Sequence, residues 1–95
     1  MAPVEVSAAA LQDLDGLIET RSLPSNARER VRQRLEVLEA FPGVGRGLEG
    51  RWHSYRVLIG PLRWMLFVYL VLEEEDRVLI VTVQDARTGD AATHE

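Results

Sequence analysis

The chain has 95 residues, of which 46% are hydrophobic, and this corresponds to one small globular domain. Its formal net charge is −4 and it contains no cysteine, which excludes disulfides, thiol catalysis and cysteine-ligated zinc. The N-terminal sequence lacks the pattern of a secretory signal, and the longest apolar run, residues 64–72, is too short to span a bilayer. We expect a cytoplasmic protein without a cofactor, a metal or a membrane-bound segment.

The N-terminal half predicts a short strand followed by two helices. Residues 4–6 have a strand pattern, and residues 7–20 have the apolar spacing of a helix that is capped by its first serine. This helix ends before Pro24, because the residue that precedes a proline is pushed out of the helical region. Ser25 or Asn26 caps a second helix, whose many arginines are interpreted as a solvated outer face.

The next segment, residues 41–50, contains four glycines and has the composition of a phosphate-binding loop. Such loops follow a strand and open a helix, whereas this segment follows a helix and leads into a strand. We therefore interpret it as a flexible connector in which Arg46 is available as a contact.

The C-terminal half predicts three strands. Apolar residues alternate with period two on both sides of a turn at Gly60-Pro61. The acidic residues 73–76 predict the next turn, and residues 77–83 form the β-branched run of a buried strand. The order β-α-α-β-β-β predicts a two-layer α+β fold, in which a helical hairpin packs on a four-stranded, mainly antiparallel sheet with one open face.

We expect a single domain over residues 1–95. Its core would extend over about residues 4–87, and residues 88–95 form a polar tail that we expect to be flexible.

A cationic segment stands out in this acidic chain. It comprises Arg46, Arg51, His53, Arg56 and Arg63. A tight hairpin turn would pair Leu58 with Arg63 and make Arg56 and Arg63 diagonal neighbours, roughly 7–8 Å apart, on the sheet face away from the helices. Leu58, Met65 and Phe67 would share that open face, and Val57 and Leu66 would face the helices. Two guanidinium groups this close repel each other by on the order of 2 kcal/mol at an effective dielectric of about 20. Either a bound anion or a carboxylate, for example that of Glu49 or Asp85, would then lie between them.

Taken together, these features resemble the RelE/ParE family of type II toxin–antitoxin toxins. The resemblance rests on the strand and helical hairpin, the spacing of Pro42, Gly45, Leu48 and Gly50, the pair Tyr55-Arg56, Gly60 followed by Arg63, and the run VLIVTV with Arg87 just beyond it. It covers about residues 4–87. It implies the fold described above and a cognate antitoxin that wraps the toxin in a hetero-oligomer and blocks its active face.

RelE-like members cut messenger RNA in the ribosomal A site, where the 2′-hydroxyl attacks the adjacent phosphate. By position, the resemblance implies that Arg63 clamps this phosphate and that Arg87 stabilises the transition state. The residues so implied are Arg56, Arg63, Arg87 and His94 for catalysis, and Arg46, Arg51 and His53 for binding RNA or another anion.

ParE-like members share the fold but inhibit DNA gyrase and need no catalytic residues. RelE-like enzymes are rich in lysine, whereas all eleven cations here are arginine, which cannot act as a general base. An acidic chain also fits a protein target more easily than a ribosome. We take the ribosome-dependent endoribonuclease as the first hypothesis, gyrase inhibition as the alternative, and a non-toxic binding or regulatory relative as the third.

Overall fold

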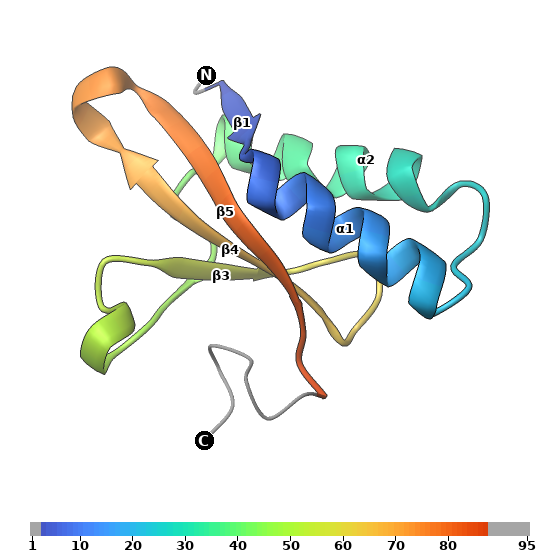
Figure 1. Cartoon of the computed structure of the whole chain (residues 1–95). Helices are drawn as coiled ribbons and strands as arrows, with labels where there is room; N and C mark the ends of the chain where they lie inside the picture. Colours follow the sequence, from blue (N-terminus) through green and yellow to red (C-terminus); the bar gives the residue numbers. More distant parts are fainter. Residues whose placement is uncertain (1–2, 88–95) are drawn as a thin grey trace.

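The computed structural model describes residues 3–87 of the chain (Figure 1). In chain order its elements are β1 (Val4–Val6), α1 (Ala8–Thr20), α2 (Ala27–Ala40), β2 (Arg46–Gly47), a 3₁₀ turn (Gly50–Trp52), β3 (Arg56–Ile59), β4 (Met65–Leu72), a second 3₁₀ turn (Glu73–Glu75) and β5 (Arg77–Asp85). The predicted tail at residues 88–95 lies outside the described residues.

Two helices pack on a five-stranded sheet of order β1-β5-β4-β3-β2 (Figure 1). β1 pairs parallel to β5, and every other pair is antiparallel. This confirms the predicted two-layer α+β fold. The sheet has one strand more than predicted, because Arg46 and Gly47, which we expected in a flexible connector, pair with β3.

The start of α1 follows the predicted capping. The Ser7 side chain accepts a hydrogen bond from the Ala10 amide at 3.0 Å, and its hydroxyl donates to the Val81 carbonyl oxygen at 3.1 Å. The same residue therefore caps the helix and attaches it to β5. Asn26 occupies the corresponding position before α2, but its side chain makes no capping hydrogen bond.

The main core lies between the helices and one face of the sheet. Its buried members are Ala10, Leu14, Val31, Leu35 and Leu38 from the helices, and Leu58, Met65, Phe67, Tyr69, Val78, Ile80 and Val83 from the sheet.

The register of the β3–β4 hairpin differs from the predicted one. Leu58 pairs with Phe67, four positions further along the chain than Arg63. The connection between the strands is longer than a tight turn. It is closed by a hydrogen bond of 2.8 Å from the Gly60 amide to the Met65 carbonyl oxygen, and the Met65 amide donates to the Leu62 carbonyl oxygen within it at 2.9 Å.

The assignment of the two sheet faces is also wrong. A slip by an even number of residues preserves which side chains share a face, so Leu58, Met65 and Phe67 still lie together. This set packs beneath the helices instead of on the open face. The opposite face carries a smaller buried cluster of Val57, Leu66 and Val68. Because both sets are apolar, the alternation pattern does not indicate which of them the helices cover.

A buried tyrosine holds the connector between α2 and β2 against the sheet. The Tyr69 hydroxyl donates to the Pro42 carbonyl oxygen at 2.8 Å and accepts from the Gly45 amide at 2.9 Å. Burial raises the pKa of Tyr69, so the phenol keeps the proton that it donates. Gly45 is closely packed here, since a Cβ atom would lie 2.6 Å from both the Tyr69 hydroxyl and the Val57 carbonyl oxygen.

We expect Gly45→Ala to lower the free energy of unfolding by about 1–3 kcal/mol, because neither a buried hydroxyl nor a strand carbonyl can move aside without losing hydrogen bonds. Gly43→Ala and Gly47→Ala are matched controls, since a Cβ atom at either position meets nothing within 4 Å. Urea unfolding measures all three variants. Equal midpoints for Gly45→Ala and the controls would show that the close approach is relieved at no cost.

Candidate functional site

Arg56 does not lie on the open face of the sheet, and its side chain binds the connector between α2 and β2. Its partner across the hairpin is Tyr69, whose side chain lies in the core beneath the helices. Its Nη1 atom donates to the carbonyl oxygens of Gly45 at 2.8 Å and Gly43 at 3.2 Å. Arg63 lies beyond the other end of β3, which is about 10 Å long. The prediction that Arg56 and Arg63 are diagonal neighbours is therefore wrong.

Arg63 instead shares a concave surface with two other arginines. This surface has a volume of about 430 Å³ and lies at the edge of the sheet formed by β2 and β3. We call it the arginine hollow, and its lining is Arg34, Val44, Gly45, Arg46, Val57, Leu58, Ile59, Arg63, Leu66 and Ala86. The three arginines come from α2, β2 and the β3–β4 connection, so only the tertiary fold brings them together.

The positive charge of the arginine hollow is not compensated locally. No carboxylate belongs to its lining. Arg34 donates from Nε to the Ile59 carbonyl oxygen at 2.8 Å, which holds its guanidinium group in place. The side chains of Arg46 and Arg63 make no hydrogen bond or ion pair with any of residues 3–87. The sequence analysis missed Arg34, because nothing in its spacing separates it from the other arginines of α2.

Arg87 is paired with a carboxylate. Its Nε and Nη2 atoms donate to Asp85 at 2.9 and 2.8 Å, and its guanidinium carbon lies 4.5 Å from the centroid of the Trp64 ring. Arg21, at the end of α1, donates to the same carboxylate at 3.1 Å. Asp85 is only 5% exposed. The hydrogen bonds from Arg87, with those from Arg21, hold the pKa of Asp85 well below its usual range.

The remaining predicted site residues lie apart from the arginine hollow. His53 is exposed, with Nδ1 3.2 Å from the Gly50 carbonyl oxygen, and it lines a separate polar depression together with Arg56. Arg51 is exposed in the 3₁₀ turn. His94 lies outside the described residues. Within residues 3–87, no group of three His, Asp or Glu side chains could hold a metal ion.

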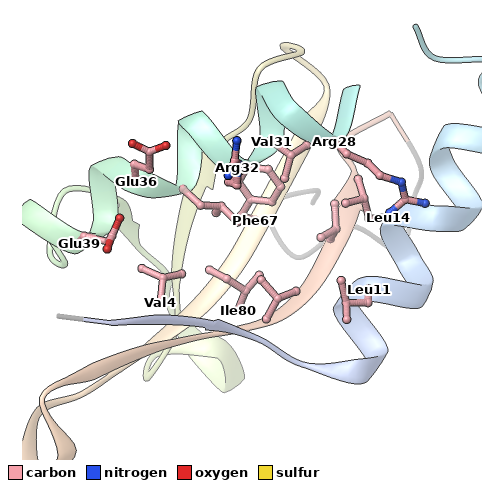
Figure 2. A pocket seen from close by; sticks show the side chains of 13 residues that line it. Val4, Leu11, Leu14, Arg28, Val31, Arg32, Glu36, Glu39, Phe67 and Ile80 are labelled. Carbon is pink, nitrogen blue, oxygen red and sulfur yellow. The ribbon is translucent and has the colours of Figure 1, made fainter. Parts of the chain in front are cut away.

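A second concave surface is an apolar groove of about 340 Å³ between α1, α2 and β1 (Figure 2). Its lining is Val4, Val6, Leu11, Leu14, Arg28, Val31, Arg32, Leu35, Glu36, Glu39, Phe67, Ile80 and Val83. We call it the helix groove. Leu11 remains 46% exposed at its rim.

Charge is divided along the helix groove. Arg28 and Arg32 lie toward the start of α2, and Glu36 and Glu39 lie toward its end (Figure 2). The two arginines are paired with acidic side chains of the helices. Glu36 and Glu39 make no ion pair within residues 3–87, so the acidic end is the one left to a partner.

Comparison with known proteins places this chain in a family. The sequence profile described as the ParE toxin of the type II toxin–antitoxin system parDE matches residues 4–88. The chain belongs to the ParE toxin family. The match confirms the resemblance to RelE/ParE toxins, and the chain is a toxin of the type II toxin–antitoxin class.

Solved structures of RelE and ParE complexes share the fold of this toxin. A chain of the chromosomal ParDE system from P. aeruginosa aligns with a TM-score of 0.72 and 14% identity, over 92% of this chain and 98% of that one. A chain of the RelBE2 complex from Mycobacterium tuberculosis aligns with a TM-score of 0.69 and 20% identity, over 88% of this chain and 96% of that one. A chain of the intact E. coli RelBE complex aligns with a TM-score of 0.66 and 19% identity, over 93% of this chain and 100% of that one. No curated protein sequence matches this toxin significantly.

The part of this toxin that the structure describes contains no helix long and apolar enough to cross a membrane.

We expect Asp85→Asn to lower the free energy of unfolding at neutral pH by about 1–3 kcal/mol, because both arginines lose a charged acceptor but remain free to meet water. The native pKa of Asp85 is depressed, so its contribution is complete above the unfolded-state pKa of about 3.9 and is lost as the pH falls toward the native pKa. Denaturant unfolding between pH 7 and pH 2 should show the gap between wild type and variant closing in acid.

Asp15→Asn is the matched control, because it removes the acidic partner of an exposed ion pair with Arg28. We expect this variant to change the stability by less than about 0.5 kcal/mol. A stability gap for Asp85→Asn that stays constant down to pH 2 would show that the ionised Asp85 carboxylate is not the source of the stabilisation.

Proposed function

We propose that this toxin inhibits DNA gyrase in the bacterial cytoplasm by binding it, without a catalytic step of its own. The observation that carries this proposal is the separation of the arginines. Arg56 is bound to connector carbonyls and Arg87 is bound to Asp85, and neither of them belongs to the lining of the hollow that contains Arg63. RNA cleavage would need these groups around one phosphate, whereas gyrase inhibition needs only a binding surface.

The overall charge supports the same proposal. A protein that binds RNA gains affinity by neutralising phosphates, whereas in this chain fifteen acidic residues outnumber eleven arginines. The match to the ParE profile points in the same direction, since the ParE branch of the family is the one that the resemblance connects with gyrase.

We expect the purified toxin to inhibit supercoiling by purified gyrase and to cause cleaved DNA to accumulate. Induction of the toxin alone should stop growth. A supercoiling assay without inhibition at saturating toxin would rule out the gyrase proposal. Primer extension on messenger RNA from translating extracts is the parallel experiment, and new 5′ ends there would establish the endoribonuclease instead. Growth unaffected by induction would identify a non-toxic relative.

The helix groove is the surface that we assign to the cognate antitoxin. Two of the solved structures that share this fold are toxin–antitoxin complexes, which supports an antitoxin partner for this chain. A groove between two helices accepts the apolar side of an amphipathic helix. Because Glu36 and Glu39 are unpaired within the described residues, we infer that the antitoxin helix carries basic side chains at the corresponding end.

We expect Leu11→Asp to weaken antitoxin binding at least about tenfold, because a carboxylate at this rim would lose its water in the complex, and the arginines of the groove are already paired with acidic side chains. Leu11 is exposed in the free toxin, so folding and toxicity should persist. Phe41→Asp is the matched control, since Phe41 is 64% exposed and lies outside the groove. Coexpression with the cognate antitoxin should rescue growth for the control but not for Leu11→Asp. Equal rescue of both variants would place the antitoxin on another surface.

A further inference from the structure

We propose that the arginine hollow binds an acidic peptide segment of a protein partner. In this arrangement carboxylates pair with Arg46 and Arg63, and an apolar side chain of the peptide enters between Val44 and Ile59. The proposal goes beyond gyrase inhibition and does not depend on which cellular target the toxin inhibits.

The charge of the arginine hollow selects an anionic ligand. Arg34, Arg46 and Arg63 line one concave surface of a chain whose net charge is −4, and no acidic residue shares that lining. Arg46 and Arg63 have no partner within residues 3–87, so their hydrogen-bond donors are available to a ligand. A guanidinium group donates through a planar fork that matches the two oxygens of a carboxylate.

The apolar part of the lining distinguishes a peptide from a small inorganic anion. Val44 is 53% exposed and Ile59 is 54% exposed, although both are large aliphatic side chains. Val57 and Leu66 lie beneath them in the same hollow. Exposed aliphatic surface surrounded by arginine is the composition of a protein–protein contact, in which apolar anchors give affinity and charges give specificity.

The same lining disfavours single-stranded nucleic acid. Proteins that bind single strands present aromatic side chains on which successive bases stack. No aromatic residue lines the arginine hollow. An acidic peptide uses both features that are present, the free guanidinium groups and the aliphatic floor.

The walls of the hollow are held in place before any ligand binds. Arg56 and Tyr69 fix the connector that carries Val44 and Arg46, through the carbonyls of residues 42, 43 and 45 and the amide of residue 45. Arg34 is fixed from the other side by its bond to the Ile59 carbonyl oxygen. A preformed surface loses little conformational entropy on binding, and this favours measurable affinity for a short segment.

The test uses the full-length toxin and a short fluorescent peptide in which glutamates alternate with leucines. We expect saturable binding by fluorescence anisotropy that weakens as salt is raised. Arg46→Gln/Arg63→Gln should reduce the affinity roughly tenfold to a hundredfold, because two charge-assisted hydrogen bonds are lost. Ile59→Ser should also reduce it, which a purely electrostatic contact would not show.

Arg51→Gln/Arg77→Gln is the matched control, because it removes the same charge from two arginines outside the hollow. This control should bind the peptide like wild type, and the isosteric peptide with glutamine in place of glutamate should not bind. Thermal unfolding checks that every variant is folded. An equal loss of affinity in both double variants would overturn the proposal, because it would indicate a diffuse charge effect. Tighter binding of a short single-stranded RNA at the same hollow would overturn it as well.

Discussion

The hydrogen bonds of the Tyr69 hydroxyl group determine where the connector between α2 and β2 lies, and the arginine hollow depends on that connector. The hydroxyl group is buried in the core, and it joins the connector after α2 to the middle of the sheet through Pro42 and Gly45. A buried phenol must satisfy its hydrogen-bonding groups, and here both its donor and its acceptor are used on one loop. Arg56 binds the same loop from the neighbouring strand. The connector is therefore a fixed part of the sheet edge, and its two strand residues extend the sheet beyond β3.

This packing determines which arginines have partners within the protein. An arginine at the start of β3 lies within reach of the connector carbonyls, so Arg56 becomes a structural donor. An arginine after β5 lies beside the buried carboxylate of Asp85, so Arg87 becomes half of an ion pair. Two guanidinium groups remain without partners in the described part of the molecule. They belong to Arg46 in β2 and to Arg63 in the β3–β4 connection. The arginine hollow is located there for that reason.

Much of the fold could be predicted from the sequence, because its signals are local. Ser7 marks the start of α1, the acidic residues 73–76 mark a turn, and the β-branched run from residue 77 marks the buried strand. The register of the central hairpin could not be predicted, since it depends on how residues 60–64 fold and Gly60-Pro61 suggests a tighter turn than the one that forms. The face beneath the helices could not be predicted either. Val57 and Leu66 are as apolar as Leu58 and Phe67, so only tertiary packing separates the two sets.

The candidate site was less predictable than the fold, and the reason lies in the chemistry of arginine. A guanidinium group has several donors in a rigid plane, so it binds backbone carbonyls, as Arg34 and Arg56 do, as readily as it binds carboxylates. The number of arginines in the sequence therefore overestimates the number of guanidinium groups whose donors are available to a ligand. Strand parity brought Arg56 and Arg63 together in the prediction. In the structure Arg56 binds backbone carbonyls and Arg87 binds an aspartate, and neither lines the hollow that contains Arg63. What remains is a smaller cationic surface with an aliphatic floor, and this composition suits recognition of a protein better than cleavage of a phosphodiester.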